Sequence, residues 1–379
     1  MNGGAIDPAE AHHGPTPVNL LTGFLGSGKT TLLQRLLTDA SMANAAVLIN
    51  ELGEIGLDHH LLERIDDNVV LLKSGCVCCT VRGEVADALQ SLHAQRARGE
   101  IPFFDRVVIE STGLADPYPA LSTLRAHPVL KSQFRVGKVI ATVDAVNGLS
   151  AVAHRLEAVR QIAAADIIVV TKTDLCDERT TMAVRSRLGE LNPTAAIITA
   201  ADATLPRRLT ARSAQSADEL EWIAEALPAG DEAGPSHAMS RHGDHHHHSH
   251  DEDDAHAVRS VSMVFENDVD WTGFGIWLTM LLNRHGDRIF RVKGILNVAG
   301  EANPVAIHAV QRLIHPPVHM KRWPDERRQS RLVFIAEGID PQQIRRSFEV
   351  FRRLSTRVLA DDPVVGADRA LEAETSASA

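Results

Sequence analysis

Short runs rich in β-branched residues recur through the first half of the chain, and each is followed by a stretch with helical periodicity. The seven runs, all between Val18 and Ala200, are VNLLTG, AAVLIN, NVVLLK, RVVIES, GKVIATV, DIIVVTK and AAIITA. This alternation is typical of a parallel sheet, because each parallel connection needs a crossover segment. The sequence therefore predicts an α/β domain whose mostly parallel sheet is covered by helices on both faces.

Changes in composition along the chain predict where its domains begin and end. Ser216 and Glu219 form a capping-box pattern, which predicts a last helix ending near Leu227. The stretch HGDHHHHSHDEDDAH follows, with seven histidines and five acids among fifteen residues, and it cannot form a core. We expect a flexible N-terminus at 1–15, a first domain at 16–228, a His- and acid-rich linker at 229–257, a second domain at 258–357 and a flexible tail at 358–379.

The second domain has its own pattern of strands and helices. Strands are expected at VRSVSMVFE, RIFRVKGILNV and RLVFIAEG. One helix presents an apolar face made of Trp271, Phe274, Leu278, Leu281 and Leu282. A later helix carries the stripe Ile344, Phe348, Phe351 and Leu354, which places Arg345, Arg346, Arg352 and Arg353 on its solvent face. These elements predict a smaller α+β domain.

Composition excludes several classes of protein. The 379 residues carry a formal charge of -10, which argues against nucleic-acid binding because phosphate contacts need a concentrated positive face. No apolar run approaches the roughly 18 residues that a membrane span needs. No apolar signal segment opens the chain, and a chain of this length buries a core without disulfides. We expect a protein of the reducing cytoplasm.

The stretch GFLGSGKT, Gly23 to Thr30, matches the P-loop pattern between a predicted strand and a predicted helix. Its backbone N–H groups and the positive helix N-terminus would wrap phosphates, Lys29 would reach the terminal phosphates in catalysis, and Thr30 would give its hydroxyl to Mg²⁺. The expected nucleotide-binding residues here are Gly26, Ser27, Gly28, Lys29, Thr30 and Thr31.

Two further segments complete the expected phosphate and magnesium site. RVVIESTG ends a strand in Glu110, an acid that can hold Mg²⁺ through water and act in catalysis, and Gly113 can bring its backbone N–H to the γ-phosphate. The segment INELGEIGLDHHLL occupies the position of a nucleotide-sensitive switch at 51–58, and we expect Glu51 to contribute to the magnesium site.

The tetrapeptide TKTD, Thr171 to Asp174, follows the strand DIIVV and is expected to read the base. Asp174 can accept two hydrogen bonds from the guanine edge, and the stem of Lys172 can cover the ring. This favours GTP over ATP. Thr171 stands where GTPases usually have Asn.

Three of the four cysteines, Cys76, Cys78 and Cys79, stand at i, i+2 and i+3, whereas Cys176 stands alone. Thiolates at this spacing suit a soft or borderline ion such as Zn²⁺, and a buried structural cluster is the alternative. The cysteines follow the strand NVVLLK, so we expect them at the same sheet edge as the nucleotide, close to its γ-phosphate.

The motifs GFLGSGKTTLL, NELGEIGLD, SGCVCCTVRGE, VVIESTGLADP and TKTDL, in this order, resemble those of the CobW family of P-loop GTPases. The resemblance continues into the second domain through RVKGILNVAGE and SRLVFIAEGID, although Leu52 stands where the family frequently has Phe. It implies a GTP-hydrolysing metallochaperone in which Cys76, Cys78 and Cys79 hold the cargo, zinc or cobalt. It also implies that Glu110 replaces an aspartate common in GTPases.

The expected function is delivery of a divalent transition metal, zinc first, to a client protein, with GTP and Mg²⁺ setting the geometry of the cysteine segment through the switch. An auxiliary metal-collecting role is expected for His245, His246, His247, His248 and His250, with a solvated spacer or a purification tag as the alternatives. Rival interpretations are a cobalt-handling GTPase of cobalamin synthesis, a passive metal buffer and a signalling GTPase with structural cysteines. Homo-oligomerisation is left open.

Overall fold

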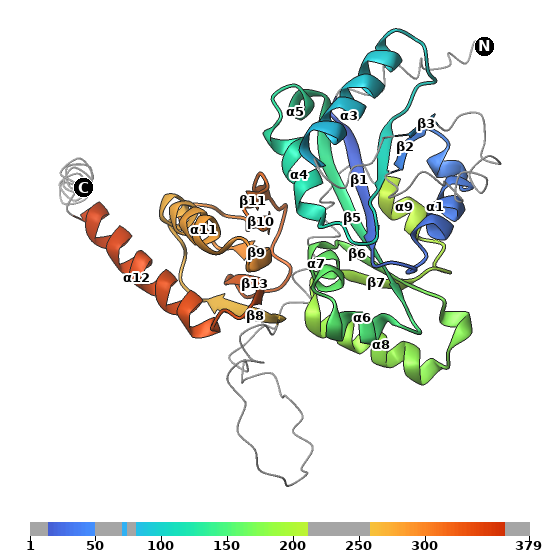
Figure 1. Cartoon of the computed structure of the whole chain (residues 1–379). Coiled ribbons are helices and arrows are strands. Elements are labelled where there is room, and N and C mark those ends of the chain that lie inside the picture. Colours follow the sequence, from blue (N-terminus) through green and yellow to red (C-terminus); the bar gives the residue numbers. More distant parts are fainter. Residues whose placement is uncertain (1–13, 50–69, 74–80, 211–257, 361–379) are drawn as a thin grey trace, which may run out of the picture. The chain divides into compact units, whose positions relative to one another are not determined.

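The computed structural model describes residues 14–49, 70–73, 81–210 and 258–360 (Figure 1). These residues form two compact units, one on each side of the segment 211–257. The expected helix near Leu227, the switch, the cysteine triplet and the histidine run lie outside the described residues. Within the described residues, no helix is both long enough and apolar enough to span a membrane.

The first unit is built on a seven-stranded sheet with the strand order β3-β2-β4-β1-β5-β6-β7 (Figure 1). Every neighbouring pair is parallel. All seven predicted runs are strands, namely β1 (Thr16–Gly23), β2 (Ala45–Ile49), β3 (Val70–Lys73), β4 (Arg106–Glu110), β5 (Phe134–Asp144), β6 (Ile167–Thr171) and β7 (Ala196–Thr199). The prediction of a mostly parallel α/β domain is therefore confirmed, and the sheet is wholly parallel.

Helices cover both faces of this sheet. They are α1 (Lys29–Leu37), α3 (Val81–Ala97), α4 (Pro117–Ala126), α5 (Leu130–Gln133), α6 (Gly148–His154), α7 (Leu156–Ala164), α8 (Glu178–Leu191) and α9 (Leu205–Thr210), with short 3₁₀ turns η1 (Ala40–Met42) and η2 (Thr173–Leu175). On one face, the leucines of α1 pack with Leu205 of α9 against the sheet. On the other face, α4 and α7 contact each other and β5. Burial of these apolar faces holds the carboxyl ends of the strands at one edge.

The second unit has a six-stranded sheet in the order β11-β10-β9-β13-β8, with β12 paired to β10, and its ladders are antiparallel. Its elements are β8 (Val258–Phe265), α11 (Trp271–His285), β9 (Ile289–Leu296), β10 (Val305–Val310), β11 (Leu313–Ile314), β12 (Val318–His319), β13 (Ser330–Glu337) and α12 (Pro341–Ala360). The predicted α+β domain is confirmed. Strands β10 to β12 were not among the predicted elements.

Two details of the second unit correct the expected helix faces. Trp271 is 41% exposed because it is the first residue of α11, and Trp277 lies instead in the core, beside Phe274 and Phe348. Arg345 is half-buried rather than on the solvent face, since it donates a hydrogen bond of 2.8 Å to the carbonyl of Ser262 on β8.

Candidate functional site

The P-loop lies between the end of β1 and the start of α1, as predicted. Gly23, Gly26 and Gly28 have φ values of 146°, 71° and 87°, a region that favours glycine. Gly28 is the N-cap of α1, which begins at Lys29. The structure therefore places Gly26 to Thr31 in a tight loop and the first turn of a helix, where backbone N–H groups and the helix dipole favour an anion.

Two side-chain contacts attach this loop to the neighbouring strands. Ser27 is 3% exposed, and its hydroxyl lies 2.6 Å from the hydroxyl of Thr142 on β5. Thr171 at the end of β6 donates a hydrogen bond of 2.7 Å to the carbonyl of Ser27. Thr171, which stands at the Asn position of the predicted base-reading motif, therefore holds the P-loop. Thr142 was not predicted, because no local pattern identifies a partner 115 residues away.

Two residues predicted to hold magnesium, Thr30 and Glu110, contact each other, and Lys29 precedes Thr30 in the chain. The ammonium of Lys29 donates to the carbonyls of Gly23 at 3.0 Å and Phe24 at 3.4 Å, so it lies along the loop. The hydroxyl of Thr30 donates to a carboxylate oxygen of Glu110 at 2.8 Å, and Glu110 is only 5% exposed. A hydroxyl and a carboxylate are the oxygen ligands that suit Mg²⁺. Glu51, the third predicted contributor, lies outside the described residues.

Gly113 lies in a turn directly after β4, closed by a hydrogen bond of 3.1 Å from the N–H of Ala115 to the carbonyl of Thr112. A Cβ added at Gly113 would lie 2.8 Å from the backbone N and Cα of Leu25 in the P-loop. Only glycine therefore allows this close approach of the two loops. Gly113 thus lies against the P-loop, and the contact of its N–H with the γ-phosphate stays a prediction.

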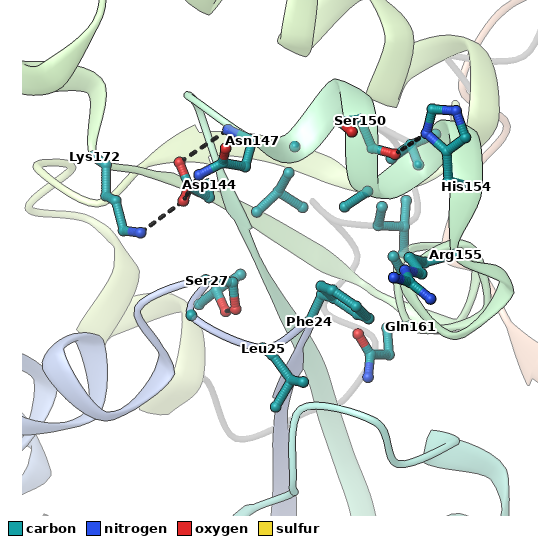
Figure 2. A pocket seen from close by; sticks show the side chains of 18 residues that line it. Phe24, Leu25, Ser27, Asp144, Asn147, Ser150, His154, Arg155, Gln161 and Lys172 are labelled. Atoms are coloured by element: carbon teal, nitrogen blue, oxygen red, sulfur yellow. Dashed lines mark hydrogen bonds and ion pairs between the residues drawn. The ribbon is translucent and has the colours of Figure 1, made fainter.

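The predicted base-reading motif is anchored by a residue that the sequence analysis did not identify. Lys172, with φ 55°, donates from its ammonium to a carboxylate oxygen of Asp144 at 2.6 Å (Figure 2). Asp144 ends β5 and also accepts hydrogen bonds from the N–H of Val146 at 2.7 Å and from the amide of Asn147 at 3.1 Å. Asp174 is exposed on η2. The signal available in the sequence was the acid directly after the run GKVIATV.

The stability that Asp144 contributes depends on pH, because its carboxylate accepts these hydrogen bonds in the charged form. Burial by itself raises the pKa of Asp144, but hydrogen bonds from Lys172, Asn147 and the backbone of Val146 hold that pKa below its ordinary value. A lowered pKa contributes stability that is present above the ordinary value of 3.8 and is lost as pH falls through the folded value.

Asp144→Asn is therefore expected to lower the free energy of unfolding by about 1–3 kcal/mol near neutral pH, because a charged hydrogen-bond acceptor is lost. Urea denaturation followed by circular dichroism, at neutral pH and at a pH well below 3.8, should show this difference shrinking as the pH falls through the lowered pKa of Asp144, because the wild-type carboxylate is then protonated as well. The exposed variant Asp174→Asn should match the wild type throughout. A constant difference between Asp144→Asn and the wild type at both pH values would contradict the assignment.

A cavity of about 450 Å³ opens beside the P-loop (Figure 2). Its lining comes from Phe24 to Ser27, from the end of β5 and from α6 and α7, with Lys172 at its edge. Lys29 and Thr30 are not part of the lining. The cavity therefore lies on the α6–α7 side of the P-loop. It is next to the residues predicted to bind the phosphates and does not cover them.

The predicted cargo site is not described. Cys76, Cys78, Cys79 and the five predicted auxiliary histidines lie outside the described residues. In the part of the chain that the structure describes, no three His, Cys, Asp or Glu side chains group in a way that could hold a metal. Cys176 is described and lies with its sulfur 3.3 Å from the hydroxyl of Thr181.

Each of the two units matches a known protein family. Residues 17–199 match the family described as CobW/HypB/UreG, nucleotide-binding domain, and residues 258–352 match the cobalamin synthesis protein cobW C-terminal domain.

Similar proteins align over most of the chain. The zinc chaperone YjiA of Escherichia coli is 32% identical over 339 residues, which cover 89% of this chain and 99% of the relative. The zinc chaperone CobW of a Sinorhizobium species is 28% identical, with 86% and 94% covered. A crystal structure of Zn(II)-bound YjiA GTPase from E. coli superposes with a TM-score of 0.66 at 28% identity, covering 89% of this chain and 99% of that one.

A full P-loop, a buried strand-end glutamate that meets its threonine, and a separate antiparallel second unit thus occur together in one chain that aligns with these relatives along nearly its whole length. The chain belongs to the CobW family of P-loop GTPases.

Proposed function

We propose that this protein is a GTP-hydrolysing zinc metallochaperone. The observation that carries the proposal is the contact between Thr30 and Glu110 at the edge of the sheet, beside Lys29. Lys29 would bind the terminal phosphates, and Thr30 and Glu110, joined by Glu51, would hold Mg²⁺, which would neutralise developing charge during hydrolysis. Gly113 would donate its N–H to the γ-phosphate, and Lys172 and Asp174 would bind guanine.

The register of the sheet supports a link between this site and the cysteines. Ile49 pairs with Lys73 on one side and with Glu110 on the other. Strands lie about 4.8 Å apart, so the backbones of Lys73 and Glu110 are about 10 Å apart. Cys76 follows Lys73 by three residues, and three residues span at most about 10 Å. Connectivity alone therefore limits the distance between Glu110 and Cys76 to about 20 Å, which is compatible with the proposed link.

Zinc is the proposed cargo, held by Cys76, Cys78 and Cys79, with the histidine run at 245–250 as an auxiliary collector. The donor chemistry and the names of the zinc chaperone relatives both support it. Coupling between two sites is worth about 1–3 kcal/mol, whereas binding at thiolate-rich zinc sites is worth about 10–16 kcal/mol. GTP hydrolysis would loosen the metal, and a client with its own ligands would complete the transfer. Cobalt, which accepts the same ligands, stays the alternative cargo.

The test is a zinc titration of the full chain with Mg²⁺ and either a non-hydrolysable GTP analogue or GDP. The two nucleotide states should differ in zinc affinity by roughly 5- to 150-fold. Cys78→Ala should lose most of the zinc affinity while binding both nucleotides normally, because it removes a thiolate and leaves the P-loop intact. Equal zinc affinities in the two states would refute the coupling, and unchanged zinc binding by Cys78→Ala would refute the cysteine site.

A further inference from the structure

Gln161 on α7 makes an unusual pair of contacts for a core residue. Its side chain is 1% exposed, and its amide nitrogen donates to the carbonyls of Gly113 at 3.0 Å and Ala115 at 3.1 Å. Two facing carbonyls require a donor, so the nitrogen end of the amide must point this way. The amide oxygen has no hydrogen-bond partner among the described residues, and Gln161 lines the cavity beside Phe24 (Figure 2).

The loop that Gln161 holds is attached to α7 at a second point. Arg160, the preceding residue, lies 3.6 Å from the carboxylate of Asp116. Asp116 caps α4 by accepting a hydrogen bond of 2.9 Å from the N–H of Tyr118. Successive residues of one helix therefore hold the turn at Gly113 and the start of α4 that follows it.

Gly113 is confined on the opposite side as well. The P-loop residue Leu25 approaches it so closely that a Cβ would lie 2.6 Å from the Leu25 side chain. Gly113, the residue that carries the N–H, is therefore restrained on two sides, by the hydrogen bond from Gln161 to its carbonyl and by Leu25 against its Cα. A preorganised N–H stabilises a negative charge better than one that must first be ordered.

We infer that Gln161 is a positioning residue for the γ-phosphate: by holding the Gly113 and Ala115 carbonyls, it aims the Gly113 N–H at the terminal phosphate of bound GTP. This rests on the proposed GTPase function, and Gln161 acts through Gly113 without touching the nucleotide. GDP has no γ-phosphate. Loss of Gln161 therefore weakens GTP binding and slows hydrolysis while leaving GDP binding unchanged.

The experiment compares Gln161→Met with the wild type by measuring the Kd of GDP and of a non-hydrolysable GTP analogue, together with kcat and KM for GTP. Methionine has a similar volume but no donor. The preference for the GTP analogue over GDP should fall roughly tenfold, as expected for a hydrogen bond to a charged group, with GDP affinity within about twofold of wild type. Gln161→Asn, which keeps the amide on a shorter arm, should lie between the two.

Asn192→Leu is a matched control. Asn192 is also fully buried, and its amide nitrogen donates to the carbonyls of Ile162, Ala163 and Ala165 at the carboxyl end of α7, without contacting the turn at Gly113. The control should lose stability as Gln161→Met does but keep the wild-type preference for the GTP analogue.

Two results would overturn the inference. If Gln161→Met loses stability like Asn192→Leu but keeps the wild-type preference, Gln161 is only a structural residue and the proposed function stands. If the wild type itself neither binds nor hydrolyses GTP, both the inference and the proposed function fail.

Discussion

Lys29→Ala is expected to reduce the rate of GTP hydrolysis by about two to three orders of magnitude, the typical loss when a preorganised group that stabilises the transition state is removed. The ammonium of Lys29 donates hydrogen bonds to the carbonyls of Gly23 and Phe24, where it can also contact a phosphate bound in the loop. The fold should persist because Lys29 is half-buried at the first turn of α1 and outside the apolar core. Phosphate release under single-turnover conditions measures the loss directly.

The control for this prediction is Lys131→Ala, which removes an exposed cation from α5 and should leave the rate unchanged. Zinc binding by the Lys29→Ala protein should persist, but its dependence on added nucleotide should disappear. A Lys29→Ala protein that hydrolyses GTP at the wild-type rate would show that the phosphates bind elsewhere.

Glu110→Gln is expected to reduce the rate of GTP hydrolysis about 100-fold or more. It should also raise the concentration of Mg²⁺ that is needed for the half-maximal rate. The change removes the negative charge while keeping the shape of a side chain that is only 5% exposed. The amide can still accept a hydrogen bond from Thr30, so folding should change little. The measurement is a magnesium titration of GTP hydrolysis.

Thr30 offers a graded comparison for the same site. Thr30→Ser keeps the hydroxyl that contacts Glu110 and should retain most of the activity, whereas Thr30→Val removes the hydroxyl and should resemble Glu110→Gln. If Glu110→Gln and the wild type showed the same dependence on Mg²⁺, the glutamate would have no role in holding the ion.

Much of the first unit could be predicted because its determinants are local. A run of β-branched residues that ends in a polar residue defines a buried strand and its carboxyl end, and parallel strands bring those ends to one edge. The P-loop after β1 and Glu110 at the end of β4 could therefore be placed together from the sequence, and the hydrogen bond between Thr30 and Glu110 confirms their proximity. The glycines of the loop also predicted its backbone conformation, because glycine is the residue that most readily adopts a positive φ.

The contacts that connect the parts of the site could not be predicted in this way. Gln161 and Gly113 are 48 residues apart, and Asp144 and Lys172 are 28 apart. Gln161 looks like an ordinary polar residue in an amphipathic helix until the packing of α7 against the sheet buries it. Trp271 was wrongly expected on the buried face of α11 and the buried Trp277 was not predicted, because the start of α11 relative to the sheet is set by packing and not by periodicity.

The sequence by itself determined the parallel sheet, the P-loop, the glutamate at the end of β4 and the presence of a second α+β unit, since each depends on a local pattern of residue types. Only the tertiary structure decided that Thr171 binds the P-loop carbonyl of Ser27, that Asp144 anchors Lys172 and that Gln161 of α7 binds the carbonyl of Gly113. Such contacts depend on how helices settle on a sheet. That arrangement follows from the summed packing of many side chains, which no short stretch of the chain encodes.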